Sequence, residues 1–376
     1  MYFTNATLFT ESGWQTGSFE VTDEGKFGAI LPDAVPADAV DLQGAKVIPG
    51  LVDVHIHGAM GADFSDGDPN GLRKMARYLL KEGVTGFTPA SMTLPYDVLN
   101  KAFQTGKQLA EECPTDCARI LGIHMEGPYF CEAKKGAQNG AYLKKPDIEG
   151  FLALQEACGG LIKIVDVAPE LPGAVAFIRQ AKDLCTVSIA HTDSDYEDAK
   201  AAIDAGVTHL THLFNAMPGI GHRAPGVIPA AAENPAVRAE LICDGMHIHP
   251  ATVRLAFQLF GPDRMILISD GLRCTGMPDG EYPFGGQTIT LKNSIGTLPD
   301  GTIAGAVSNL FTDMCNAIRF GVPEEWAIQA ATINPAKSIG ADKLLGSITT
   351  GKLADFIVCS ADYTTKRVFR SGKEVL

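Results

Sequence analysis

The sequence lacks the features that mark membrane, secreted and nucleic-acid-binding proteins. No stretch reaches the ~20 apolar residues that cross a bilayer, and residues 1–10 have neither the basic start nor the apolar core of a secretion signal. The 9 cysteines include no CxxC pair, and such a scattered, odd set is typical of reduced thiols in a cytoplasm. Lys and Arg form no block, and 31 of them stand against 44 Asp and Glu, a net charge of −13. We therefore expect a cytoplasmic protein that binds neither nucleic acid nor a membrane.

The composition is that of a folded globular chain. Of the 376 residues, 45% are hydrophobic and 20% are charged. This mixture excludes a disordered, collagen-like or coiled-coil protein and is enough to bury a sizeable core. The length predicts two domains, or one large barrel with an accessory unit.

Both ends of the chain carry short β-like segments broken by Gly, Asp and Pro. Residues 1–49 contain such segments at 2–9 and 18–21, and residues 346–376 contain another at 366–370. Neither end has a helical period. We expect 1–49 and 346–376 to form one small β-sandwich domain together.

Residues 50–345 alternate between compact apolar runs and amphipathic segments. The runs predict strands at 47–55, 86–91, 120–126, 162–167, 187–191, 209–214, 240–244 and 265–270. The amphipathic segments predict helices near 71–81, 96–112, 147–158, 172–183, 195–205, 250–260, 307–320 and 324–333. Eight strands with interleaved helices indicate an α/β fold, a (β/α)8 TIM-like barrel. A doubly wound open sheet is the alternative, but no Gly-rich phosphate loop follows any of these strands.

The segment 276–301, after the eighth predicted strand, interrupts the alternation. It contains Pro-Asp-Gly and Gly-Gly turn signals, which favour a β-hairpin. Such a hairpin is either a cover over the mouth of the barrel or a surface decoration.

Polar residues stand at or just after the ends of several predicted strands. They are His55, His57, Glu126, His191, His212 and Asp270. A single histidine is more often an ordinary core residue, but strand ends of a barrel converge on one mouth, where active sites of this fold lie. Imidazole and carboxylate groups together are the ligands of Zn²⁺ or Fe²⁺. The sequence therefore predicts a metal centre at the mouth.

Several motifs resemble a known family. The segment PGLVDVHIHG at 49–58 is similar to the strand-one signature of the amidohydrolase superfamily. Four further segments resemble, more narrowly, the N-acetylglucosamine-6-phosphate deacetylases: HMEGPY at 124–129, KKGAQN at 134–139, THLFNAM at 211–217 and TIAG at 302–305. The resemblance continues to GKLAD at 351–355 and so covers nearly the whole chain.

The resemblance implies a metal-dependent hydrolysis of the acetamide of N-acetyl-D-glucosamine 6-phosphate to D-glucosamine 6-phosphate and acetate, in amino-sugar catabolism. Glu126, His191 and His212 would bind the principal divalent metal, Zn or Fe. Asp270 would be the general base that activates water and then protonates the leaving amine. His55 and His57 would allow a second metal bridged by Glu126, so we expect one or two ions per chain. The resemblance also implies a homodimer.

The resemblance further implies a set of substrate-binding residues. They are Ala137, Gln138, Asn215, Ala216, Arg223, His247, Ile303, Ala304, Gly305 and Ala306. The guanidinium of Arg223 suits a phosphate, which it can bind through two hydrogen bonds. His247 would add a second cation or support the site from behind. Gln138 stands where certain relatives have a histidine proposed to polarise the carbonyl, and an amide can donate one hydrogen bond there but cannot become cationic.

Two other functions stay open. A cyclic-amide hydrolase of the dihydroorotase or hydantoinase kind typically carries a carboxylated lysine at the end of strand four, but the only lysine in 162–167 is Lys163, near its start. A catalytically silent scaffold of the same fold would be expected to have lost metal ligands, and the set here is intact. N-acetylgalactosamine 6-phosphate stays open as the substrate.

Overall fold

Eight parallel strands form a closed barrel in the computed structural model, which describes residues 1–32 and 34–375. In chain order they are β6 (Leu51–Ile56), β9 (Val84–Pro89), β11 (Ile123–Met125), β12 (Ile162–Val167), β13 (Thr186–Ile189), β14 (His209–Leu210), β15 (Arg238–Ile242) and β16 (Met265–Ile268). Adjacent strands pair in parallel from β11 to β16 and between β6 and β9, and the short β10 (Arg119–Ile120) also pairs with β9. A bridge between Ala90 and His124 joins β9 to β11, and the Asp270 N–H donates to the His55 carbonyl at 2.9 Å, which joins β16 to β6. The predicted TIM-like barrel is confirmed.

The first predicted strand, 47–55, is in fact two strands. β5 (Lys46–Pro49) pairs with the strands of the chain ends, whereas β6 belongs to the barrel. Gly50 lies between them, and a Cβ at this position would come within 2.4 Å of the Thr85 hydroxyl oxygen. The chain therefore passes too close to β9 here for any residue with a side chain. The sequence did not predict this boundary, because the apolar run continues across it.

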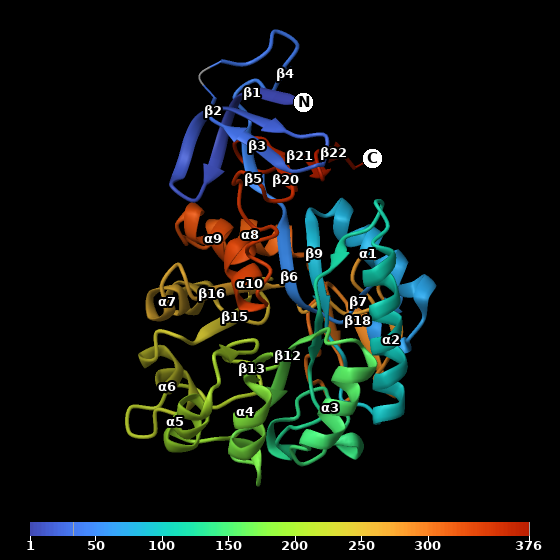
Figure 1. Ribbon diagram of the computed structural model, residues 1–376. Helices are drawn as coiled ribbons and strands as arrows, with labels where there is room; N and C mark the ends of the chain where they lie inside the picture. The colour runs from blue at the N-terminus through green and yellow to red at the C-terminus, as the bar shows by residue number, and fades with distance from the viewer. Residues whose placement is uncertain (33, 376) are drawn as a thin grey trace.

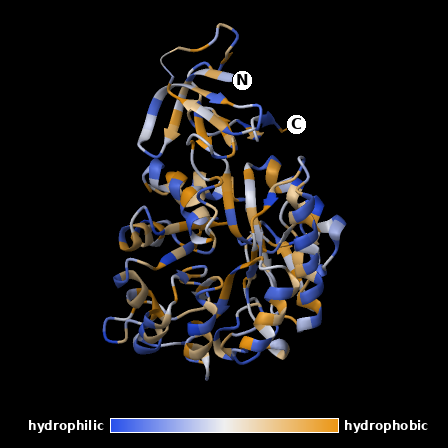
Figure 2. Cartoon of the chain, in the orientation of Figure 1, coloured by the Kyte–Doolittle hydropathy of each residue, from blue (hydrophilic) through white to orange (hydrophobic). Residues whose placement is uncertain are grey.

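Helices surround the barrel (Figure 1). They are α1 (Pro69–Lys81), α2 (Tyr96–Glu112), α3 (Ile148–Ala157), α4 (Ala174–Ala181), α5 (Tyr196–Ala205), α6 (Val227–Glu233), α7 (Pro250–Phe260), α8 (Leu310–Arg319), α9 (Glu324–Ala331) and α10 (Ile333–Ser338). Short 3₁₀ turns occur at η1 (Phe64–Asp66), η2 (Glu132–Lys134) and η3 (Gly140–Tyr142). Figure 2 shows hydrophilic and hydrophobic residues together on the surrounding helices, as expected of amphipathic helices that cover a barrel. The sequence did not predict α6, because seven residues are too few to show a helical period.

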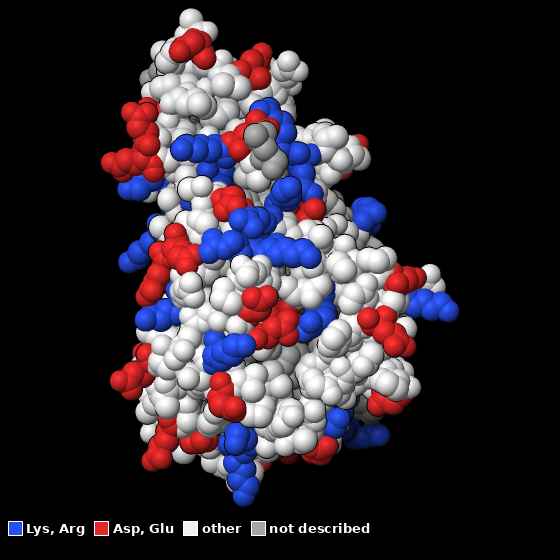
Figure 3. Space-filling view, turned by 90° about the vertical axis from the view of Figure 1, so that its right-hand side faces the viewer, with Lys and Arg blue, Asp and Glu red and all other residues white. Residues whose placement is uncertain are grey.

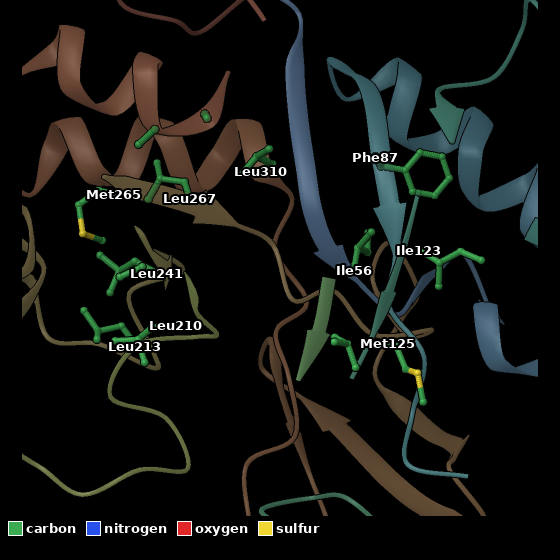
Figure 4. Packing of buried hydrophobic residues seen from close by; sticks show 14 of the residues in the cluster. Ile56, Phe87, Ile123, Met125, Leu210, Leu213, Leu241, Met265, Leu267 and Leu310 are labelled. Atoms are coloured by element: carbon green, nitrogen blue, oxygen red, sulfur yellow. The ribbon is translucent and has the colours of Figure 1, made fainter. Parts of the chain in front are cut away.

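The barrel strands are buried on both faces, as a parallel sheet covered by helices requires. Along β16, Met265 and Leu267 pack in the cluster that reaches the helices, and Ile266 and Ile268 pack in a second cluster with Val52. This alternation follows from the period of two in a strand. Figure 4 shows part of the first cluster, with Leu210, Leu241 and Leu267 on neighbouring strands. Burying a side chain of this size contributes about 1.5–3 kcal/mol.

Both ends of the chain meet in one eight-stranded sheet beside the barrel (Figure 1). We call it the terminal sheet, and it contains β1 (Tyr2–Thr10), β2 (Gly13–Val21), β3 (Phe27–Ile30), β4 (Val40–Asp41), β5, β20 (Phe356–Cys359), β21 (Lys366–Arg370) and β22 (Lys373–Glu374). The strand order is β22-β21-β20-β5-β1-β2-β3, with β4 beside β1. Residues 33 and 376 of the predicted terminal segments lie outside the described part of the chain. The predicted segments at 2–9, 18–21 and 366–370 are confirmed as β1, β2 and β21.

Basic side chains hold the terminal sheet against the barrel. Arg119 of β10 pairs with Asp355, just before β20, and Arg370 of β21 donates to the Pro114 carbonyl at 2.8 Å. Figure 3 shows Lys and Arg gathered along this boundary. Because these pairs join segments more than 200 positions apart in the sequence, they fix how the two parts of the fold meet.

The insert after the eighth strand is a three-stranded antiparallel sheet rather than a simple hairpin. β17 (Gly280–Phe284) and β18 (Gln287–Lys292) form the predicted hairpin, and β19 (Ile295–Thr297) extends it. The Gln287 side-chain amide donates to the Ala137 carbonyl at 2.9 Å, so the insert contacts a loop that follows β11. A small hairpin, β7 (Gly58–Ala59) with β8 (Ala62–Asp63), follows β6. No helix in the described part of the chain has the length and apolar character needed to cross a membrane.

Candidate metal centre and active site

Three polar residues lie two positions beyond the ends of barrel strands, and each has a left-handed backbone. His191 follows β13 with φ 45°, His212 follows β14 with φ 32°, and Asp270 follows β16 with φ 46°. Residues other than glycine seldom adopt this conformation, and each instance costs about 1–3 kcal/mol. Here the turn directs each side chain toward the axis of the barrel, where the three meet.

Glu126, His191 and His212 converge on one point. Glu126 Oε1 lies 3.1 Å from His191 Nε2 and 3.2 Å from His212 Nε2, and the two imidazole nitrogens are 3.1 Å apart. Ligands held about 2.0–2.2 Å from one Zn²⁺ lie about 3.0–3.6 Å from each other. The spacing of the three donor atoms therefore fits a shared divalent cation. All three side chains are buried.

His55 and His57 form a second group with the same carboxylate. His57 Nε2 lies 3.2 Å from Glu126 Oε2, and His55 Nε2 lies 3.8 Å from Glu126 Oε1. The two Nε2 atoms are 3.4 Å apart. Asp270 Oδ1 is 3.5 Å from His55 Nε2 and 3.4 Å from His57 Nε2. Glu126 thus stands between two donor groups, with Oε1 toward His191, His212 and His55 and Oε2 toward His57.

Backbone carbonyls set the orientation of two of these rings. The Ala90 carbonyl lies 3.2 Å from His57 Nδ1, and the Lys134 carbonyl lies 2.9 Å from His191 Nδ1. A carbonyl oxygen can only accept, so each Nδ1 carries the proton and donates it. Nε2 of each ring then faces the centre, which is the arrangement of a metal-binding histidine.

The centre strongly favours ionised carboxylates. Burial raises the pKa of Glu126, but His57, His191 and His212 outweigh it and hold that pKa well below its usual range. Burial likewise opposes ionisation of Asp270, and the charges of His55 and His57 lower its pKa. Burial lowers the pKa of His212, yet its contact with Glu126 raises that pKa to about 9. Both carboxylates are therefore charged at neutral pH, and they attract a cation.

Gln138 lines the cavity with an amide that is hydrogen-bonded at both ends. Its Nε2 donates to Glu126 Oε2 at 2.6 Å, and its Oε1 accepts from the Thr93 backbone N–H at 2.8 Å. Both ends of the amide are therefore engaged, and the side chain is buried. In this geometry, Gln138 fixes the position of the Glu126 carboxylate.

A cavity of about 260 Å³ opens beside the metal centre. The predicted substrate residues that line it are Ala137, Gln138, Asn215, Ala216, His247, Ile303 and Gly305. Phe284 of β17 also lines it, so the insert reaches the mouth of the barrel. Ala304 and Ala306 are buried beside the cavity, and the Ala306 N–H donates to the Asp270 carbonyl at 2.8 Å.

Arg223 lies elsewhere. It is exposed and lines a separate cavity together with Asp193 and Tyr196. The basic side chain that lines the cavity outside the metal centre is instead His247. Burial lowers the pKa of His247, but its hydrogen bond with Asp244 Oδ2, at 2.7 Å, raises it above the ordinary value.

A layer of buried polar side chains lies beneath the centre, and the sequence analysis did not assign it a role. Glu240 of β15 contacts His55 and His209, and Asp166 of β12 accepts from His124 Nε2 at 3.0 Å. Asp53 of β6 accepts from the Ser269 hydroxyl at 2.6 Å. The sequence signal that indicates this layer is a single acidic residue inside each of these apolar strands. Such an acid requires buried hydrogen-bond donors.

The end of β12 has no lysine. Lys163 is the second residue of the strand, and its ammonium group donates to the Gly160 carbonyl at 3.3 Å, away from the mouth. The carboxylate that stands between the two donor groups is Glu126 of the loop after β11. This arrangement does not favour the cyclic-amide hydrolases with a carboxylated lysine.

Comparison with known proteins identifies the class. Residues 46–375 match the amidohydrolase family. The chain is 38% identical over 332 residues to an N-acetylglucosamine-6-phosphate deacetylase of Bacillus subtilis (strain 168), with 87% of this chain and 82% of that protein covered. It is 35% identical over 372 residues to the deacetylase of the same name from Vibrio furnissii, with 96% and 92% covered. The chain therefore belongs to the amidohydrolase family and, within it, to the N-acetylglucosamine-6-phosphate deacetylases.

Solved structures agree. A mutant N-acetyl-D-glucosamine-6-phosphate deacetylase from Mycobacterium smegmatis, in complex with N-acetyl-D-glucosamine-6-phosphate, matches with a TM-score of 0.94 and 31% identity. The match covers 100% of this chain and 99% of that one. An N-acetylglucosamine-6-phosphate deacetylase from Pasteurella multocida matches with a TM-score of 0.92 and 28% identity, over 99% and 98% of the two chains.

Proposed function

We propose that the protein hydrolyses the acetamide of N-acetyl-D-glucosamine 6-phosphate to D-glucosamine 6-phosphate and acetate, as a step in amino-sugar catabolism. The observation that carries the proposal is the convergence of Glu126, His191 and His212 beside Asp270, in a chain whose relatives bear this activity in their names. An amide is hydrolysed by water only when the water is activated and the leaving amine is protonated.

Asp270 supplies the proton transfers in this proposal. A divalent cation, when bound, lowers the pKa of water and polarises the acetamide carbonyl. Asp270 is ionised at neutral pH because nearby histidines lower its pKa, so it can accept a proton from water. The same carboxyl then protonates the leaving nitrogen. The walls of the cavity include the apolar side chains of Leu272 and Phe284.

The metal ligands are Glu126, His191 and His212 in this proposal, with His55 and His57 as ligands of a second ion. Imidazole and carboxylate donors suit Zn²⁺ and Fe²⁺, so the cofactor is Zn or Fe, one or two ions per chain. Metal analysis of protein purified without chelators measures both identity and number. Protein without bound metal, even after Zn²⁺ or Fe²⁺ is added, would contradict the proposal and favour a silent scaffold.

The phosphosugar occupies the cavity beside the metal centre. Ala137, Asn215, Ala216 and the loop from Ile303 to Ala306 contact the sugar, and His247 binds the phosphate. His247 suits this role because Asp244 favours its protonated form. Arg223, which the resemblance implies for the phosphate, lines a separate cavity and stays a prediction.

The epimeric substrate is a second candidate. The chain is 30% identical over 370 residues to an N-acetylgalactosamine-6-phosphate deacetylase of Escherichia coli O157:H7, with 97% of each covered. The deciding experiment measures kcat/KM for both epimeric 6-phosphates and for both sugars without phosphate, with metal-reconstituted protein. We expect the highest value for the glucosamine derivative. Faster turnover of the galactosamine derivative would reassign the substrate, and turnover of neither would overturn the proposal.

We further propose two domains, with 1–49 plus 346–376 as a small β-sandwich and 50–345 as the catalytic barrel. The support is the curvature of the terminal sheet. Phe19 of β2 and Phe356 of β20 have ring centroids 5.1 Å apart, although β1 and β5 separate their strands in the sheet. Strands lie about 4.8 Å apart, so the sheet must bend over to bring these rings into contact.

A homodimer and a cytoplasmic location complete the proposal. Ile220 and Met246, on the loops after β14 and β15, are 48% and 49% exposed, and such apolar side chains beside the mouth suit an interface between two copies. This interface would include the loop that carries Arg223, and the molar mass in solution tests it. All nine cysteines lie in the described part of the chain and are free thiols, which suits a reducing compartment.

A further inference from the structure

Glu240 occupies the middle of the buried polar layer beneath the metal centre. Its Oε2 lies 3.0 Å from His55 Nδ1 and accepts from the His212 backbone N–H at 3.2 Å. Its Oε1 lies 3.0 Å from His209 Nε2. The side chain has no exposed surface.

These contacts define Glu240 as an acceptor. Three donors surround its two oxygens, so both oxygens act as acceptors and the group is a carboxylate without a proton. His55 must then donate from Nδ1, and its Nε2 faces Glu126 and Asp270. His57 and His191 obtain the same orientation from backbone carbonyls. His55 is the ring in the second group that depends on a side chain for it.

We propose that Glu240 is a positioning residue for the metal centre: it fixes the ring of His55 with Nε2 toward Glu126, and it ties the turn that carries His212 to the same carboxylate. One side chain therefore supports a ligand in each of the two donor groups. The inference rests on the proposed metal centre and goes beyond it, because Glu240 contacts neither the cavity nor the convergence point of the ligands.

A matched pair of variants tests this role. Glu240→Gln keeps the size of the side chain but replaces one acceptor oxygen with a donor, so it cannot accept from all three neighbours. Asp166→Asn makes the same change at another fully buried acid, which accepts from His124 and Thr211 and, in the described part of the chain, has no hydrogen bond to a predicted metal ligand. Zn²⁺ affinity is measured on metal-free protein by competition with a chromophoric chelator, without substrate.

We expect Glu240→Gln to weaken Zn²⁺ binding about 10- to 100-fold, the usual effect of removing a partner that orients a metal-binding histidine. Asp166→Asn should leave the affinity unchanged. His55→Asn should weaken the same binding step, and the double variant with Glu240→Gln should lose less affinity than the two single losses combined. Additive losses in the double variant, or wild-type affinity in Glu240→Gln, would overturn the inference.

Folding and function are separated in the same experiment. Circular dichroism and thermal melting of each variant show whether it folds, and Glu240→Asp, which withdraws the carboxylate by one methylene, replaces a Gln variant that does not. It should weaken Zn²⁺ binding in the same direction, and unchanged affinity would contradict the role. A wild-type protein that binds Zn²⁺ but lacks deacetylase activity would overturn the proposed function and leave the inference on Glu240 standing.

Discussion

The side-chain amide of Gln138 donates to Glu126 Oε2 at 2.6 Å and accepts from the Thr93 N–H at 2.8 Å. Gln138 belongs to a loop after β11, so this contact ties a loop over the mouth to the carboxylate between the two donor groups. Gln138 therefore positions Glu126 with one of its amide N–H groups.

Gln138→Ala should therefore act through Glu126 and through folding. It leaves the buried Thr93 N–H without an acceptor and Glu126 Oε2 without its donor. Each loss costs about 1–3 kcal/mol. Denaturant unfolding should show a lower free energy of unfolding, and kcat/KM should fall with it. Asn139→Ala, which removes an exposed loop cap from the Ala141 N–H, is the control and should change neither greatly.

Asp270→Asn should fold and bind metal but lose most of its turnover. The amide cannot accept the proton from water, and general acid–base catalysis contributes about 10²–10⁴-fold. We expect kcat to fall by at least that factor while the Zn²⁺ content stays as in the wild type. Measurement of acetate release together with metal analysis checks both statements. Turnover close to the wild-type rate would exclude Asp270 as the general base.

Binding of the phosphate should depend on pH through His247. Asp244 raises the pKa of His247 above its ordinary value despite burial, so the ring stays charged to higher pH. As pH rises through that pKa, the charge is lost, and with it a charge-assisted hydrogen bond worth about 1.5–3 kcal/mol. KM for the phosphosugar should therefore rise about tenfold or more above this pH.

Two controls isolate the effect. KM for the sugar without phosphate should not change over this pH range. Asp244→Asn should move the rise in KM for the phosphosugar to lower pH, because the hydrogen bond to the Asp244 carboxylate raises the pKa of His247. A KM that changes equally for both sugars would place the titration outside the phosphate site.

Removal of metal should lower the melting temperature. Without a cation, Glu126, Asp270 and the histidines are held close together by the fold alone. A ligand that binds only the folded state stabilises it by about 2.7 kcal/mol at a concentration 100 times its Kd. Thermal melts before and after chelation, and again after Zn²⁺ or Fe²⁺ is restored, measure this. Identical melting temperatures in all three samples would argue against a bound metal.

Asp355→Ala should destabilise the contact between terminal sheet and barrel. Asp355 is buried, pairs with Arg119, and accepts from the Ser371 N–H at 2.7 Å. Removing one partner of a buried ion pair costs about 3–5 kcal/mol. Equilibrium unfolding should show this loss. Asp116→Ala, which breaks the exposed pair with Arg77, should lower the free energy of unfolding by about 1 kcal/mol at most.

The sequence predicted the barrel because apolar runs and helical periods are local signals. It also predicted that Glu126, His191 and His212 lie together, since residues at strand ends of a barrel must meet. It could not separate β5 from β6, because both are apolar and only the close approach at Gly50 divides them. Nor could it place Arg223, whose loop position depends on packing between distant segments.

Partners of single side chains were equally beyond the sequence. Glu240 and Gln138 gain their roles from residues 185 and 12 positions away, respectively. A buried acid in a strand indicates that donors exist but does not name them. Hydrogen-bond partners of this kind depend on register and strand order, which only the folded chain supplies.

The left-handed turns at His191, His212 and Asp270 have a consequence for protein engineering. Glycine at any of the three would relieve a strained backbone, but it would also leave a buried space and remove the side chain that the turn presents to the centre. Selection that demands turnover would therefore retain the strain at all three positions and seek gains in stability elsewhere in the fold.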